Sequence, residues 1–233
     1  MIKIDNFTKK YGKRIAVEDF SILCEKGSIT ALLGANGAGK TTILKAVCAR
    51  HFASAGKIEV CGVDAAEDAE KVRLLTGFVE EEPILPKDFL VSEYVSICAK
   101  IKMTEPDAIE KVKSRCSLSE IWHEKIANLS KGQRERVNFA QALVNDPPVL
   151  VLDEPASGLD PAQIVKMRSL VKSIKKNRTI ILSTHLMQEV DALCDKICVI
   201  SHGKNVAFGT ASQIILKTNT KNLEEAFFKL SQE

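Results

Sequence analysis

The fold of this chain is decided by the stretch Gly34-Ala-Asn-Gly-Ala-Gly-Lys-Thr-Thr42. It matches the pattern G-x-x-x-x-G-K-[ST], in which the backbone N–H groups of a glycine-rich loop surround nucleotide phosphates. The run Ser28–Leu33 before it is apolar and β-prone, and Ile43–Arg50 after it has helical periodicity. A strand, a glycine turn and a helix N-terminus bring amide donors and a positive dipole end to one point. The sequence therefore predicts a phosphate-binding loop here, rather than a glycine-rich turn that matches by chance.

Individual residues of this loop have separate expected roles. Its glycines allow backbone angles and a close approach that a Cβ atom would obstruct. We expect Lys40 to reach the β- and γ-phosphates and the Thr41 hydroxyl to ligate Mg²⁺, and we predict that Lys40 faces solvent without nucleotide. The residues predicted to contact the nucleotide are Gly34, Asn36, Gly37, Ala38, Gly39, Lys40, Thr41 and Thr42.

Length and composition describe an ordinary globular protein. The 233 residues suffice for one large domain or two small ones, with 45% hydrophobic and 27% charged residues. The formal net charge of +3 is small. We therefore interpret the basic clusters within residues 9–14 and 172–178 as solvated surfaces rather than nucleic-acid contacts, and we expect no nucleic-acid partner.

Cysteine usage and hydropathy indicate the compartment. The seven cysteines are scattered, form no C-x-x-C pair and mostly lie in apolar stretches, which favours reduced thiols in a cytosolic chain. The first residues begin directly with strand-like alternation, so no signal peptide is expected. No apolar run approaches the roughly 18 residues that a membrane span needs. We expect a cytoplasmic chain, and if it works at a membrane, another polypeptide must cross that membrane.

Short β-prone runs alternate with helical patterns along most of the chain. Strands are expected at residues 2–8, 15–23, 56–60, 76–79, 149–153, 179–183 and 196–201. This alternation predicts an α/β core with a parallel sheet. Between about residues 83 and 145 the apolar spacing is helical and prolines punctuate it, so we expect a helical subdomain inserted in that core. Residues 1–233 are predicted to form one domain.

A second motif, Val149-Leu-Val-Leu-Asp153-Glu154, is an apolar strand that ends in two acids. A carboxylate delivered beside the glycine loop can hold Mg²⁺ and its water shell, a role that we assign to Asp153. Glu154 is then placed to polarise the water that attacks the γ-phosphate. A solvated acidic turn is the alternative for such a pair, and the phosphate loop upstream favours the metal and catalytic roles.

A third motif, Leu129-Ser130-Lys131-Gly132-Gln133, precedes a clear helical pattern. Ser130 and Gln133 have the spacing of an N-cap and N3 pair, which predicts a capping box. A capped helix start is also a site for anions, because its free N–H groups and its dipole face the ligand. The spacing alone leaves both interpretations open.

With this third motif the chain resembles, over essentially its full length, the nucleotide-binding subunits of ATP-binding cassette (ABC) transporters. Residues 34–42 resemble the Walker A loop, 129–133 the signature and 149–154 the Walker B strand. Ser157-Gly-Leu-Asp160 resembles the D-loop, His185 the switch histidine, and Tyr11 stands where that family stacks an aromatic ring on adenine. The resemblance implies a P-loop NTPase core with a small antiparallel β subdomain and an inserted helical subdomain.

The resemblance also implies an ATP hydrolase that uses ATP and Mg²⁺ and works in pairs. Two cassettes of that family, as a homodimer or heterodimer, join head to tail around two ATP molecules. Ser130 and Gly132 of one subunit would contact the γ-phosphate bound by the other, and Gln133 and Asp160 would also bind nucleotide. His185 would hydrogen-bond the γ-phosphate and orient the attacking water. A separate transmembrane permease would hold the chain at the inner face of the cell membrane.

Two positions depart from the family pattern. Lys131 replaces the glycine at the third signature position and adds a cation near the phosphates. The acidic run Glu80-Glu81-Glu82 occupies the segment where the family has its Q-loop glutamine, and in the best register Glu81 takes that position. A carboxylate at Glu81 can still ligate Mg²⁺. Because this loop links ATP chemistry to the membrane partner, the substitution bears on coupling as well.

Three functions compete at this point. The first is the ATPase subunit of a transporter, and the segments 183–204 and 223–230 resemble ABC-2-type exporters in particular. The second is an ABC ATPase that acts on DNA or ribosomes, although the 90 positions between Gly39 and Leu129 are too few for a long coiled coil. The third is a nucleotide-dependent regulator with negligible turnover, which Glu154 and His185 argue against.

Overall fold

The central layer of the molecule is a mostly parallel sheet, seen in a computed structural model that describes residues 1–231. Within those residues the sheet has six strands. Neighbouring strands of this sheet pair in parallel, except that the edge strand β10 runs antiparallel to β9. The order across the sheet is β10 (Lys204–Gly209), β9 (Lys196–Ser201), β3 (Ile29–Leu33), β8 (Thr179–Thr184), β7 (Val149–Asp153) and β6 (Thr76–Val79). Strands β3, β7 and β8 are buried at every residue, as expected for parallel strands covered on both faces.

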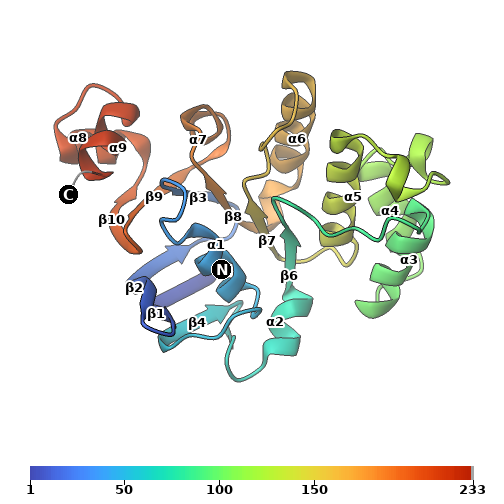
Figure 1. Cartoon of the computed structure of the whole chain (residues 1–233), viewed down its shortest axis with the longest axis horizontal. Helices are drawn as coiled ribbons and strands as arrows, with labels where there is room; N and C mark the ends of the chain where they lie inside the picture. The colour runs from blue at the N-terminus through green and yellow to red at the C-terminus, as the bar shows by residue number, and fades with distance from the viewer. Residues whose placement is uncertain (232–233) are drawn as a thin grey trace.

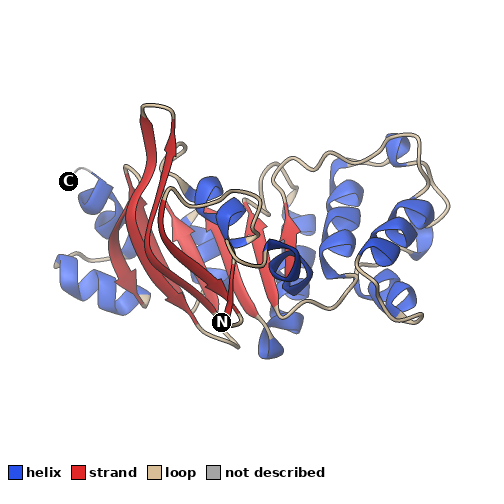
Figure 2. Ribbon diagram, turned by 90° about the horizontal axis from the view of Figure 1, so that it is seen from below, coloured by secondary structure: helices blue, strands red, loops and turns tan. Residues whose placement is uncertain are grey.

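A second, antiparallel sheet lies against one face of the first, and Figure 2 shows the strands of both in red. Its order is β2 (Arg14–Cys24), β1 (Ile2–Tyr11), β4 (Ala55–Val60) and β5 (Val63–Asp64). Burial alternates along β2, so that Phe20, Ile22 and Cys24 point inward while their neighbours face solvent. The inward side chains pack with helix α1 (Lys40–Val47).

Alternate residues of the central strands face two separate hydrophobic cores. Leu32, Val151 and Ile181 pack in the core shared with α1 and the antiparallel sheet. Their neighbours Leu33 and Leu152 pack in the other core, beneath the helices on the opposite face. Those helices are α6 (Pro161–Ile174), its 3-10 extension η3 (Lys175–Asn177), α7 (Met187–Leu193), α8 (Ala211–Thr218) and α9 (Leu223–Ser231). The edge helix α2 (Ala69–Leu75) instead joins the first core through Val72.

The helical region lies beside the β6 edge of the sheet, on the right of Figure 1. It contains α3 (Val91–Ile101), α4 (Ala108–Arg115), the 3-10 turns η1 (Ser119–Ile121) and η2 (Ile126–Asn128), and α5 (Lys131–Leu143). Amide side chains join α5 to the sheet, because Asn138 donates to the Glu80 carbonyl at 2.8 Å and Gln141 donates to the Phe78 carbonyl at 2.7 Å. That residues 83–145 form a separate subdomain stays a prediction.

The expected strands agree closely with the structure. Each of the seven segments predicted to be a strand lies within an observed one. Strands β5 and β10 were not expected: β5 is two residues long, and β10 depends on its pairing with β9. The prediction of helical spacing throughout 83–145 is wrong at residues 83–90, which form no helix. Prolines at both ends of residues 83–86 remove backbone donors there.

Candidate functional site

The glycine loop connects β3 to α1 and has the backbone that its sequence demands. Gly37 and Gly39 have φ angles of +82° and +106°, in the left-handed region that favours glycine. A Cβ atom on Gly39 would lie 2.9 Å from the Ala16 carbonyl oxygen, and one on Gly34 would lie 2.6 Å from that of Ile200. The loop is therefore packed closely between β2 and β9, and a side chain at either position would push it away.

Lys40, the first residue of α1, lies inside the curve of this loop. Its ammonium donates to the carbonyl of Gly34 at 2.8 Å and to that of Ala35 at 3.3 Å, and the residue is only 6% exposed. Its Nζ also lies 3.2 Å from Oε1 of Glu154. The prediction that Lys40 faces solvent is therefore wrong. The reason is that carbonyl groups of the loop and an acid from another strand satisfy the charge within the protein.

Asp153, at the end of β7, meets hydroxyl groups from two other elements. Its Oδ1 accepts from Thr41 Oγ1 at 3.2 Å and from Ser183 Oγ at 2.6 Å. Carboxylate and hydroxyl oxygens are the hard donors that Mg²⁺ prefers, usually together with waters and substrate phosphates. Within residues 1–231 no three His, Cys, Asp or Glu side chains cluster as a metal site. The donor set thus fits Mg²⁺ held partly by a nucleotide, rather than a metal enclosed by protein ligands alone.

Glu154 stands between a cation and a histidine. Its Oε2 lies 3.0 Å from Nδ1 of His185, which follows β8, while its Oε1 lies 3.2 Å from Nζ of Lys40 and makes no hydrogen bond within the described residues. The side chain is 8% exposed, and its backbone is left-handed, with φ at +45°. Such a backbone in a non-glycine residue has a conformational cost and is frequent at functional sites. A buried carboxylate with one oxygen that makes no hydrogen bond suits a general base.

A cavity of about 470 Å³ opens beside the glycine loop. It brings together predicted site residues from distant parts of the chain, including Tyr11, Glu81 and Glu154. Sequence reasoning missed Arg14 and Ala16, which line the cavity because β2 passes close to the loop at Ala16, and no local pattern marks them. The full lining is Tyr11, Arg14, Ala16, Asn36, Gly37, Gly39, Lys40, Thr41, Thr42, Glu81 and Glu154.

The three acids of the run 80–82 have different surroundings. The carboxylate of Glu81 accepts a hydrogen bond from Ser157 Oγ at 3.1 Å. The carboxylate of Glu80 pairs with Arg50 instead, and Glu82 is exposed. Glu81 is thus the one of the three that lines the cavity. The role of Glu81 as a metal ligand stays a prediction.

The third motif forms the start of α5 and lies outside this cavity. Ser130 and Gln133 make the capping box, with Ser130 Oγ accepting from the Gln133 N–H at 3.3 Å and Gln133 Oε1 accepting from the Ser130 N–H at 2.7 Å. The Lys131 ammonium packs against Gly158 so closely that a Cβ atom on Gly158 would clash with it. Asp160 caps α6 by accepting from the Gln163 N–H at 2.9 Å. In the part of the chain that the structure describes, the cavity is not lined by residues 130–133 or by Asp160.

Comparison with known proteins decides the family. A sequence model of the family described as ABC transporter matches residues 17–157. The chain belongs to the ABC transporter family. A relative from Ralstonia nicotianae (strain ATCC BAA-1114 / GMI1000), named Nod factor export ATP-binding protein I, is 34% identical over 224 residues, which are 92% of this chain and 68% of the relative.

Solved structures agree with the family. One described as the ATP binding subunit of an ABC transporter is 25% identical, covers 99% of both chains and has a TM-score of 0.92. The dimeric ATP-binding cassette MJ0796, bound to ADP and Pi in a post-hydrolysis state, is 23% identical with a TM-score of 0.82 and covers 90% of this chain and 98% of that chain.

Membership of the ABC family confirms several predictions. The resemblance, the P-loop α/β fold and the assignment as an ABC-type ATPase and ATP-binding subunit are all confirmed. In this ABC cassette Glu154 contacts both Lys40 and His185, and Asp153 accepts a hydrogen bond from Thr41. Within residues 1–231 we find no helix with the length and hydropathy of a membrane span.

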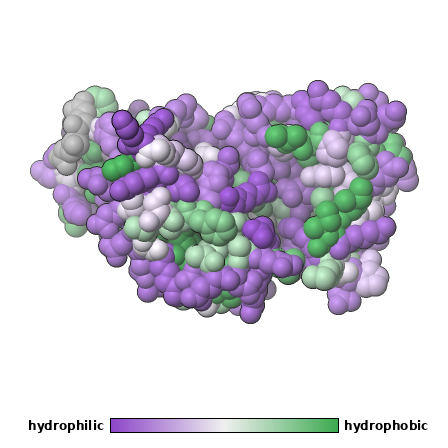
Figure 3. Space-filling view, turned by 60° about the horizontal axis from the view of Figure 1, so that its bottom comes forward, coloured by the Kyte–Doolittle hydropathy of each residue, from purple (hydrophilic) through white to green (hydrophobic). Residues whose placement is uncertain are grey.

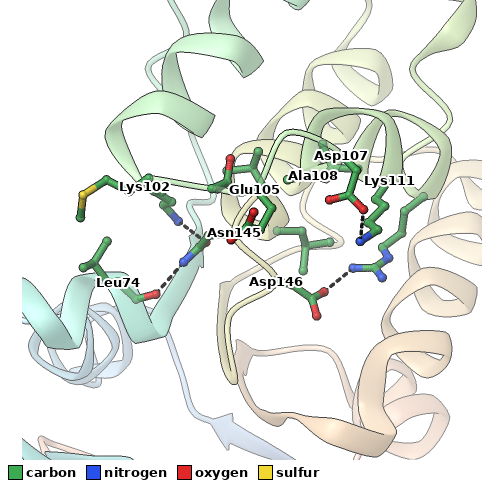
Figure 4. Close-up of a pocket in the computed structure, with 14 residues that line it drawn as sticks. Leu74, Lys102, Glu105, Asp107, Ala108, Lys111, Asn145 and Asp146 are labelled. Atoms are coloured by element: carbon green, nitrogen blue, oxygen red, sulfur yellow. Dashed lines mark hydrogen bonds and ion pairs between the residues drawn. The ribbon is translucent and has the colours of Figure 1, made fainter.

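The ABC cassette has a larger cavity, of about 590 Å³, at a different place. It lies among the ends of α2, α3 and α5 and the length of α4, and Figure 4 shows pairs of polar and charged side chains in it. Lys102 donates to Asn145 at 3.1 Å, Lys111 pairs with Asp107, and Arg115 pairs with Asp146. Lys111 and Arg115 are thus ion-paired and Lys102 is bonded to an amide, whereas the smaller cavity brings the glycine loop together with Lys40 and Glu154. The smaller cavity is therefore the candidate nucleotide site.

Proposed function

We propose that this chain hydrolyses ATP with Mg²⁺ as one half of a cassette dimer and thereby powers transport through a separate permease. The contact of Glu154 with both Lys40 and His185 is the observation that carries the proposal. It places a buried base, a cation and a histidine beside a loop built for phosphates, which is the arrangement that phosphoryl transfer to water needs.

Binding of ATP begins with a rearrangement of Lys40. The ammonium now bonds to carbonyls of its own loop, and triphosphate oxygens would replace those carbonyls as its partners. The N–H groups of the loop and the start of α1 would hold the remaining phosphate charge. Tyr11, which lines the far end of the cavity and is 45% exposed, would stack on the adenine ring.

Hydrolysis needs a water molecule positioned in line with the γ-phosphate. Thr41 and Asp153 would hold Mg²⁺, with Glu81 as a further ligand, and the ion would neutralise the charge that develops on the phosphates. Glu154 would accept the proton of the attacking water through an oxygen that makes no other hydrogen bond. His185 would hydrogen-bond the γ-phosphate and keep the Glu154 carboxylate in place.

A second copy of the chain, or a related cassette, would complete each site. Ser130 at the signature start and Asp160 at the end of the D-loop are exposed and do not line the cavity of their own chain. The capped α5 start has N–H groups that an anion from another subunit would satisfy. The dimeric neighbour bound to ADP and Pi supports this arrangement.

The proposed contact with the permease lies between the α/β core and the helical region, close to residues 80–83. Apolar side chains are exposed there on α3 and the adjoining loops: Ile84 is 96% exposed, Ile101 71% and Met103 75%. Figure 3 shows hydrophobic side chains on the surface of the helical part. Such a patch on an otherwise polar surface fits a protein partner. The chain would then be cytoplasmic and peripheral on the inner face of the membrane.

Purification from detergent extracts of the native host tests the proposal. We expect the chain to be recovered with a multi-helix membrane protein and to release phosphate from ATP. Replacing Ile101 and Met103 by Ser should reduce recovery of the membrane protein while the ATPase activity of the free chain is kept. Recovery with ribosomes or DNA and no membrane protein would favour the alternative ABC function.

A further inference from the structure

Tyr11 and His51 are joined at the base end of the nucleotide cavity. The Tyr11 hydroxyl lies 2.7 Å from Nδ1 of His51, and the two rings meet edge to face with centroids 5.9 Å apart. A second contact lies beside the first, since Lys9 donates to the carbonyl of Phe52 at 2.7 Å. The last residues of β1 are thus tied at two points to the turn that follows α1.

The chemistry of the Tyr11–His51 contact is that of a neutral hydrogen bond. Burial of the imidazole and the ammonium groups of Lys45 and Lys9 lower the pKa of His51. At neutral pH the ring is therefore uncharged, and the bond joins the Tyr11 hydroxyl to Nδ1 with the tautomer of the ring deciding which atom donates. The contact fixes both the position and the tilt of the phenol ring.

The surroundings of the Tyr11 ring leave one face for a ligand. The Lys9 ammonium lies 5.2 Å from the ring centroid, over one face, and His51 occupies the hydroxyl edge. The ring nevertheless keeps 45% of its surface exposed and lines the cavity together with Lys40 and Thr42. The face that Lys9 leaves open is suited to an aromatic base.

The backbone of His51 is joined to helix α1, which begins at the proposed phosphate-binding residue Lys40. Its N–H donates to the carbonyl of Lys45 at 3.3 Å, so the residue continues from helix α1, whose first residue is Lys40. One short helix therefore carries the phosphate-binding lysine at its start and the partner of the base-stacking ring just beyond its end. The distance between the two recognition points is set by a rigid element.

We propose that His51 is a positioning residue for the nucleotide base: it holds the Tyr11 ring in the place and tilt at which adenine stacks. The inference rests on the proposed ATP-binding function. A ring that is already fixed loses less conformational freedom when the base binds, so the bond contributes to ATP affinity without touching ATP. It should leave the hydrolysis step unchanged, because His51 follows the end of α1, whereas Lys40, the proposed ligand of the γ-phosphate, stands at its start.

Two ligands and a double-variant cycle test this assignment. Affinities for ATP and for inorganic tripolyphosphate, which has no base, are measured by calorimetry in a common Glu154→Gln background that prevents turnover. We expect His51→Leu and Tyr11→Phe each to weaken ATP roughly two- to tenfold, the effect of losing one hydrogen bond. The double variant should be no weaker than either single variant, and tripolyphosphate should bind all of them equally.

Conservative and control variants sharpen the result. His51→Asn keeps a side-chain polar atom near the position of Nδ1 and should retain most of the ATP affinity, whereas exposed His123→Leu should have no effect. With Glu154 restored, His51→Leu should raise KM for ATP and leave kcat unchanged. If Lys40→Ala weakened ATP binding but His51→Leu did not, this inference alone would be overturned. The same would follow if His51→Leu weakened the binding of tripolyphosphate as much as that of ATP. Wild-type protein that binds no ATP would overturn the proposed function as well.

Discussion

The ammonium of Lys40 lies 3.2 Å from Oε1 of Glu154, and both side chains are buried. The first is the Walker A lysine at the start of α1, and the second is the acid that follows β7. Without nucleotide, the two charges compensate each other inside the protein. In the mechanism proposed above, ATP binding diverts Lys40 to the phosphates and thereby frees the carboxylate for its role with water.

Glu154→Gln should keep ATP binding and lose hydrolysis. An amide cannot accept the proton of the attacking water, and losing a positioned base typically slows the reaction by about 10²–10⁴-fold. The variant should accumulate as an ATP-bound dimer. Steady-state phosphate release and size-exclusion chromatography with ATP measure the two effects. Turnover at the wild-type rate would remove Glu154 from the mechanism.

Lys40→Ala should abolish ATP binding and also destabilise the protein without nucleotide. The change leaves the buried Glu154 carboxylate without its cation and two loop carbonyls without a donor, at a cost of about 1–3 kcal/mol. The melting temperature should fall by several degrees, and ATP should no longer raise it. The double variant Lys40→Ala, Glu154→Gln should regain part of the lost melting temperature, because the buried group at position 154 is then uncharged. Equal ATP-induced melting shifts in wild type and Lys40→Ala would contradict the prediction.

Glu81→Gln should raise the Mg²⁺ concentration needed for half-maximal ATPase activity. Mg²⁺ prefers a charged oxygen to an amide oxygen, so the affinity for the metal falls while the ATP requirement at saturating Mg²⁺ changes little. Glu82→Gln is the matched control, because that side chain is exposed and outside the cavity. Glu80→Gln should act on stability through Arg50 rather than on the metal. Superimposable Mg²⁺ titrations for wild type and Glu81→Gln would rule out the ligand role.

Glu135, near the start of α5, should make stability depend on pH. Burial raises the pKa of this carboxyl to about 7, so the folded state favours the protonated form. The penalty for ionising it is absent at pH 4 and grows as the pH rises from about 4.5 to 7, so the folded state loses on the order of 2 kcal/mol over that range. Measured by urea unfolding, the free energy of unfolding should fall more between pH 5 and pH 8 for wild type than for Glu135→Gln. The same fall in both proteins would show that Glu135 does not cause the pH dependence of stability.

The sequence by itself determined the order of elements and most of the nucleotide site. Glycine spacing, buried apolar runs and helix-start residues are local properties, and each acts on the backbone within a few residues. For this reason the phosphate loop, the strand ending in Asp153 and Glu154, and the capping box at Ser130 and Gln133 all appear in the structure where they were predicted. The family pattern added Tyr11 and His185, which no periodicity marks.

The tertiary structure alone decided how these local pieces satisfy one another. Lys40 is buried because loop carbonyls and Glu154, the acid that follows β7, surround it, which its own sequence neighbourhood does not reveal. Tyr11 and His51 are 40 positions apart in sequence, and Glu81 and Ser157 are 76 apart, yet each pair is hydrogen-bonded. Such contacts depend on where the ends of distant strands and helices meet after the two cores have packed, and that arrangement is a property of the whole chain.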